Sequence, residues 1–363
     1  MRAPARRPAA ALAAALLFPA AAGAQDAERF VLRGESPEVS HVVGRLRVVA
    51  GTEREVAVEV TRRGRDASRT AVERGTADGG REALRIFPRE ARVSYPGLGR
   101  NEVVHAALRD DGRFEGGWRG DGWRGRSVSR TGGAALEIRG DDRGVETWAD
   151  VTVSVPAGGR VVLRLLAGEA TVRDVDGDLV LDVETASASV QGTRGRLRVD
   201  AGSGELRLAD ARGDLDLDLG SGSTELTRVR AGTLRVDAGS GGVRGSDVEA
   251  ASLDLDMGSG GTRLDGVRAA RIVVDGGSGD VDLGLAANVE ELRIDTGSGG
   301  VTLRVPDGFG ATFDVDTGSG GFESELPVTY TRRERGRIAG RIGDGRGRIE
   351  VDTGSGGVRI RRR

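Results

Sequence analysis

The chain has 363 residues with 54 Lys and Arg against 56 Asp and Glu, so its net charge of −2 offers no excess of either sign to attract a nucleic acid. Aromatic residues make up only 3% of the chain and glycine contributes 60 residues, which argues against a thick globular core built on large rings. With no cysteine, the protein cannot be stabilised by disulfides.

Residues 1–24 have the pattern of a secretory signal peptide. Three arginines precede an apolar run from Ala9 to Phe18, and Ala22-Gly23-Ala24 offers a small-residue cleavage site before Gln25. No later run approaches the roughly 20 apolar residues that a membrane span needs. We therefore expect an exported protein, periplasmic or at the cell surface or extracellular, with no transmembrane segment after signal removal.

The next two segments are less regular. Residues 25–109 alternate apolar and polar residues weakly and are expected to form irregular β rungs or an N-terminal cap. Residues 110–133, rich in glycine and arginine, are predicted to form an exposed loop. Within this loop two tryptophans beside arginines could stack on a sugar or an aromatic ligand, although local packing against the rest of the fold is the preferred interpretation. The residues concerned are Trp118, Arg119, Trp123 and Arg124.

Residues 134–363 contain an internal repeat centred on the tripeptide Gly-Ser-Gly. Successive serines are 18 to 21 residues apart until a final spacing of 36, which predicts a degenerate turn or an irregular insertion near residues 323–348. Apolar residues lie six and four positions before each serine and mostly three and five after it, so two short strands should flank each bend. Units this small must stack to bury their apolar faces. The serines are Ser203, Ser221, Ser240, Ser259, Ser278, Ser298, Ser319 and Ser355.

The charged positions of these strands indicate how the repeats stack. Five residues before the serine, successive repeats carry Arg198, Asp216, Arg235 and Asp254, and a second column, four residues after the serine, mostly alternates in the same way. Parallel strands stacked in register would place these side chains roughly 4.8 Å apart, where opposite charges attract. The predicted fold is all-β: a parallel β-solenoid (β-helix) of about 19-residue rungs, with its handedness undetermined.

An aspartate precedes each of these serines by three residues, and three copies read Asp-Thr-Gly-Ser, as in the active-site loop of an aspartic protease. Such a protease needs two aspartates that face each other and share one proton, which a column of eight stacked aspartates does not provide. We expect these residues to form structural corners with the serines, the carboxylates accepting from nearby backbone N–H groups and the glycines adopting positive φ. The aspartates are Asp200, Asp218, Asp237, Asp256, Asp275, Asp295, Asp316 and Asp352.

A cation along the aspartate column is the alternative to a purely structural corner. Calcium takes carboxylate oxygens, and Asp237, Asp256, Asp275 and Asp295 would be its candidate ligands. The two histidines, His41 and His105, are interpreted as packed or solvated side chains, because no nucleophile pattern lies near them. No phosphate loop, histidine cluster or nucleophile elbow is found.

These features resemble the putative-adhesin family of exported bacterial proteins. The likeness rests on strand pairs around "DTGSGGV" bends, on "GRLRV" and on the closing "RIEVDTGSGGVRIR", and it spans about Arg29 to Arg363. The resemblance implies a β-solenoid at the cell envelope or surface with no settled biochemical role. Together with the repeats, it predicts a non-enzymatic scaffold or adhesin-like protein without a cofactor, binding an unknown protein or glycan at the envelope and no nucleic acid. The alternatives are a polysaccharide-acting β-helix enzyme, by analogy of fold alone, or a calcium-binding solenoid.

Overall fold

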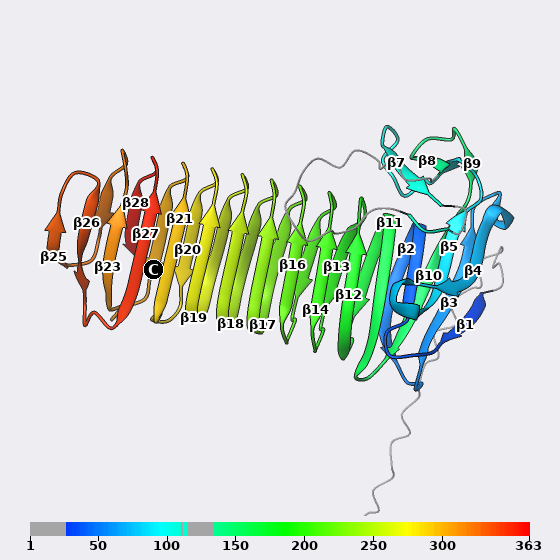
Figure 1. Ribbon diagram of the computed structural model, residues 1–363, viewed down its shortest axis with the longest axis horizontal. Helices are drawn as coiled ribbons and strands as arrows, with labels where there is room; N and C mark the ends of the chain where they lie inside the picture. The colour runs from blue at the N-terminus through cyan, green and yellow to red at the C-terminus, as the bar shows by residue number, and fades with distance from the viewer. Residues whose placement is uncertain (1–26, 110–111, 115–133) are drawn as a thin grey trace, which may run out of the picture.

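The computed structural model describes residues 27–109, 112–114 and 134–363. The secondary structure of these residues is almost entirely β, with two short 3-10 segments, η1 (Ala67–Arg69) and η2 (Asp78–Gly80). Most strands form one sheet and lie side by side along the long axis of the molecule (Figure 1). The predicted signal peptide and the predicted ligand-binding Trp118, Arg119, Trp123 and Arg124 fall outside the described residues. No helix of the described part is long and apolar enough to cross a membrane.

The N-terminal strands cover one end of this stack. The long strand β2 (Glu38–Gly51) is parallel to both β10 (Trp148–Pro156) and β11 (Gly159–Arg173). Antiparallel pairs lie around it, β1 with β3, β3 with β10, and β4 with β5. Such pairing protects the first repeat from adding a strand of another molecule. The strands are β1 (Glu28–Leu32), β3 (Val56–Arg63), β4 (Thr70–Thr76) and β5 (Glu82–Pro88).

A second sheet of four strands, in the order β7-β8-β6-β9, packs beside β2 and β11 over its own small core. Its strands are β6 (Arg92–Ser94), β7 (Val103–Leu108), β8 (Ala134–Arg139) and β9 (Val145–Glu146). The sequence pattern places the start of the regular repeats at residue 134. The structure differs, because β8 pairs antiparallel with β7 and the regular pairing begins only at Gly159 of β11.

From β11 to β20 each strand pairs in parallel with the strand one repeat later. Leu197 pairs with Leu215 and Leu215 with Leu234, steps of 18 and 19 residues. The in-register stacking that the charge pattern predicts is therefore confirmed. The strands of this region are β12 (Gly177–Val183), β13 (Ser187–Gln191), β14 (Leu197–Ala201), β15 (Leu206–Ala209), β16 (Leu215–Leu219), β17 (Thr224–Ala238), β18 (Val243–Met257), β19 (Thr262–Gly276), β20 (Val281–Leu285), β21 (Glu291–Thr296), β22 (Val301–Val305), β23 (Ala311–Asp316) and β24 (Phe322–Ser324).

The alternating apolar residues of these strands point inward and form one continuous core. This core is mostly Val, Leu, Ile and Ala and runs from Leu32 to Ile360. Phe309 and Phe313 are its fully buried aromatic residues among those the structure describes. Each rung adds only a thin layer, which aliphatic side chains fill.

The outward residues form ion pairs between rungs. Arg198 lies 3.6 Å from Asp216, and Arg235 lies 3.7 Å from Asp254. Exposed pairs of this kind contribute roughly 0.2–1 kcal/mol each, so the alternation of sign favours correct register more than it adds to stability.

At the C-terminal end the strands are not stacked in chain order. Ile349 of β27 (Gly347–Thr353) pairs with Leu292 of β21 on one side and with Phe313 of β23 on the other. β28 (Val358–Arg362) likewise lies between β22 and β24. The chain thus leaves a space of one rung between β21–β22 and β23–β24, and β27 and β28 later occupy it (Figure 1).

An antiparallel hairpin makes this return possible. It consists of β25 (Val328–Arg333) and β26 (Arg337–Ile342), and β26 pairs antiparallel with β23. The irregular insertion predicted near residues 323–348 is this hairpin, which covers the end of the stack. The arginine-rich final strand is consequently internal.

Candidate functional site: an arginine-lined groove

The Gly-Ser-Gly bends lie along one edge of the stack, and their aspartates form a single column. The pairing order is Asp200, Asp218, Asp237, Asp256, Asp275, Asp295, Asp352 and Asp316. Asp352 stands between Asp295 and Asp316 because β27 is inserted between β21 and β23. All eight serines of these bends are exposed.

The glycines of these bends have a different role from the one the sequence suggests. Of the glycines in the eight tripeptides, only Gly318 has φ in the left-handed region. A Cβ on Gly241 would overlap the carbonyl oxygen of Gly222 in the preceding rung, and one on Gly260 would overlap that of Gly241. The prediction of positive φ is therefore wrong for all but one, and close approach of successive backbones is what requires glycine.

The bends are closed in two ways. Asp316 accepts a hydrogen bond from the backbone N–H of Gly318 (3.1 Å), as expected for a corner aspartate. The threonines that follow aspartate point inward instead: the Thr296 hydroxyl donates to the carbonyl oxygen of Gly299 over 3.0 Å and is buried. The Asp-Thr-Gly-Ser motif is thus a bend that is closed by a buried hydrogen bond from the threonine hydroxyl to a backbone carbonyl oxygen.

The aspartate column is electrostatically unfavourable at its centre. Burial, and after it the charges of Asp237, Asp275 and Asp254, raises the pKa of Asp256, and burial and Asp216 raise that of Asp237. Among the described residues, no group of three or more His, Asp or Glu side chains could hold a metal ion. The geometry gives no support to calcium on Asp237, Asp256, Asp275 and Asp295.

Asp256→Asn is expected to stabilise the protein at neutral pH by about 0.5 kcal/mol, because it removes a like charge from the column. A carboxyl whose folded-state pKa is raised stabilises the fold only while it is protonated, and that contribution is lost as the pH rises through the folded pKa. The variant should therefore match the parent below pH 4 and exceed it at pH 7 in urea unfolding. Asp254→Asn, which breaks an ion pair with Arg235, is the control and should not stabilise.

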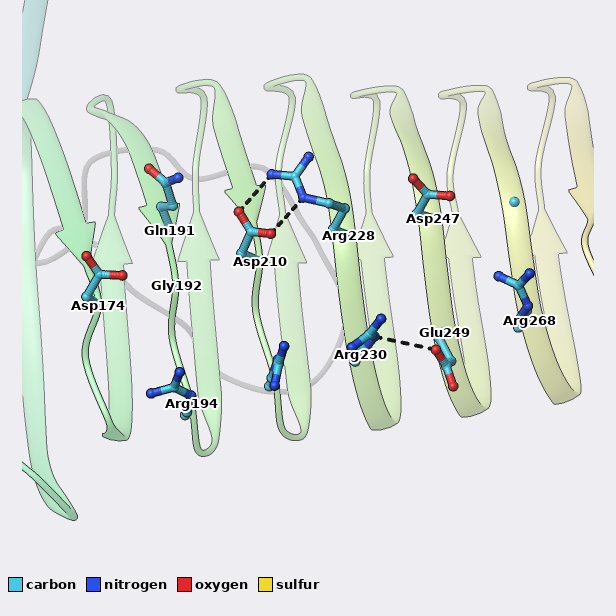
Figure 2. Close-up of a pocket in the computed structure, with 12 residues that line it drawn as sticks. Asp174, Gln191, Gly192, Arg194, Asp210, Arg228, Arg230, Asp247, Glu249 and Arg268 are labelled. Atoms are coloured by element: carbon cyan, nitrogen blue, oxygen red, sulfur yellow. Dashed lines mark hydrogen bonds and ion pairs between the residues drawn. The ribbon is translucent and has the colours of Figure 1, made fainter.

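A groove of about 570 Å³ runs along a different bend of the same repeats (Figure 2). One column of its lining residues lies at a bend where the backbone of each rung adopts the left-handed conformation. The φ angles of this first column lie between 51° and 73°, and its residues are Asp174, Gly192, Asp210, Arg228, Asp247 and Gly266. Aspartate and glycine tolerate this conformation, whereas arginine adopts it rarely. Arg228 is held there by two hydrogen bonds of 2.7 Å to the carboxylate of Asp210.

The second column of the groove is rich in arginine. Arg194, Arg212 and Arg230 are bridged in register, one rung apart, and Glu249 and Arg268 continue the column. Arg230 lies 3.6 Å from Glu249, whereas Arg194 and Arg212 form no ion pair with any described residue. Three stacked guanidinium groups thus interrupt the alternation of sign seen elsewhere.

The ion pair of Asp210 and Arg228 is held in its charged form. The hydrogen bond from Arg228 lowers the pKa of Asp210 and raises that of the Arg228 guanidinium. Both groups therefore stay charged at neutral pH, and neither is suited to exchange protons with a substrate.

This groove was not predicted from the sequence. Its second-column arginines precede the repeat serines by nine or ten residues, outside the strands that the apolar pattern predicts. The available signal was three arginines in equivalent places of successive repeats. The predicted aspartates and serines lie at the bends of the other edge, and none of them lines the groove.

Two known proteins or families bear a likeness to this chain, one by sequence and one by structure. Curated proteins give no match to this chain. A solved structure described as a "putative cell adhesion protein" from Clostridium sporogenes ATCC 15579 aligns with 93% of this chain and 99% of its own, at 11% identity and a TM-score of 0.19, which is too low to bear on the fold. The resemblance to the putative-adhesin family extends from about Arg29, whereas the match to a family model begins only within the repeats. Residues 190–361, which include most of the stacked rungs, match the family described as Toastrack DUF4097.

Proposed function

We propose that this protein is a non-enzymatic β-solenoid scaffold of the cell envelope or cell surface, which binds a partner along its arginine-lined groove. The observation that carries the proposal is repetition. The groove is built from side chains in equivalent positions of successive rungs, an arrangement suited to an extended partner.

The chemistry of the lining supports binding without turnover. Neither histidine of the chain lines the groove, and the chain has no lysine. The carboxylate of Asp210 is kept ionised by Arg228. Export is supported by the signal-peptide pattern of residues 1–24 and by the resemblance to exported adhesin-like proteins.

Cosedimentation of the purified protein with bacterial cells and with isolated cell envelopes tests the proposal. We expect association that decreases as salt rises, because exposed charges are screened. Protein that stays in the supernatant with every envelope fraction would contradict envelope binding. In a parallel incubation with acidic polysaccharides, release of shortened or unsaturated products would contradict the non-enzymatic assignment.

A further inference from the structure

We propose that the groove binds an acidic glycan, a linear chain of sugars bearing carboxylates, laid along the stack so that successive sugars meet successive rungs. The inference rests on the proposed binding function and supplies its ligand class.

The dimensions of the groove favour a linear ligand. Its lining runs from Asp174 to Arg268, and from Gly192 onward each rung contributes an equivalent pair of positions. With rungs roughly 4.8 Å apart, six of them span about 24 Å. A sugar unit in an extended glycan is about as long as one rung is thick. Equivalent groups of such a ligand therefore reach equivalent side chains of the protein.

The arginine column recognises the carboxylates. The guanidinium groups of Arg194 and Arg212 form no ion pair with a described residue, and both side chains are exposed in the groove. Guanidinium groups bind carboxylates with two parallel hydrogen bonds. Stacked arginines repel one another, and the ligand's carboxylates would neutralise this repulsion.

The opposite column distinguishes a glycan from a simple polyanion. Asp174 and Asp247 line the groove, are exposed, and form no ion pair with a described residue. Figure 2 shows them across the groove from Arg194 and Arg230. Their carboxylates would repel polyphosphate or nucleic acid, whereas sugar hydroxyls can donate hydrogen bonds to them. A carboxylated sugar chain carries the charges for one column and the donors for the other.

Titration calorimetry of the full protein with an oligogalacturonate tests this assignment. We expect binding to the oligogalacturonate and none to its fully methyl-esterified form. Arg212→Gln should weaken binding about tenfold, since one charged hydrogen-bond pair is lost. Arg244→Gln, an exposed arginine outside the groove, should bind like the parent. Failure of the oligogalacturonate to bind, or equal loss in both variants, would overturn the assignment.

A second variant separates the classes of anionic ligand. Asp247→Asn should weaken oligogalacturonate binding, because the stronger acceptor for a sugar hydroxyl is lost. If the groove is a site for any polyanion, the same variant should bind more tightly, since a repelling charge has gone. Polyphosphate or polyglutamate that binds better than oligogalacturonate would also overturn the glycan class. Should cosedimentation with envelopes persist without any oligogalacturonate binding, the ligand class fails while the scaffold function stands.

Discussion

Gly241→Ala is expected to lower the free energy of unfolding by about 3 kcal/mol, the upper range for forcing extra volume into a packed structure. The new Cβ would overlap the carbonyl oxygen of Gly222. That oxygen belongs to the backbone of the preceding rung and cannot move without separating two rungs that hydrogen-bond on both sides of the bend. The effect concerns packing alone, because the φ of Gly241 is outside the left-handed region.

The next residue provides the matched control. A Cβ on Gly242 would meet only the carbonyl oxygen of Gly261 at 3.4 Å, so Gly242→Ala should change stability by less than about 1 kcal/mol. Urea unfolding followed by circular dichroism measures both. Equal stability of the two variants would show that the bends do not approach as closely as described.

Replacing His41 with leucine is expected to make the protein more resistant to acid, by about 3 kcal/mol at pH 4. His41 is completely buried, and its register partners Leu165 of β11 and Ile86 of β5 are apolar. Burial lowers the pKa of His41 from 6.5 to about 4, an effect that the backbone of Val43 offsets in part. The neutral form is therefore the one that fits the fold.

The sign follows from where protons bind. Between pH 6.5 and about 4 the unfolded chain protonates His41 and the folded chain does not, so stability falls as the pH falls through this window. His41→Leu should remove this component, whereas His105→Gln, which changes the exposed histidine, should keep it. Unfolding free energies measured from pH 7 to pH 4 test this. A parallel pH dependence in the parent and His41→Leu would contradict it.

The stacking of the repeats could be predicted from the sequence because it depends on local, periodic features. Alternation of apolar residues fixes which side chains enter the core, and a one-residue slip would expose them. Alternating charges such as Arg235 and Asp254 then select the register. The order of the last strands could not be predicted, since β27 fits equally well beside β21 or beyond β23 by its own pattern. What decides between them is the hairpin of β25 and β26, which contains no repeat.

The candidate site was less accessible to sequence reasoning. The conspicuous Asp-Thr-Gly-Ser motif suggested a functional group, yet Thr296 and the bend glycines serve packing and backbone contact. Arg194 and Arg212 stand in irregular stretches and gain meaning only when the rungs are superimposed. That they form no ion pair with a described residue depends on which side chains the stacking brings close, and the sequence alone does not give those neighbours.

Engineered disulfides test the stacking most directly, because the chain contains no cysteine of its own. Arg293 pairs in register with Glu350, whereas Asp314 follows in the next repeat along the chain but lies beyond Glu350. Residues in register on adjacent strands are close enough for a disulfide, and those two strands apart are not. After mild oxidation of the folded protein, the Arg293→Cys, Glu350→Cys variant should form an internal disulfide and the Arg293→Cys, Asp314→Cys variant should not. The reverse result would contradict the register of the stacked strands and the position of β27 between β21 and β23.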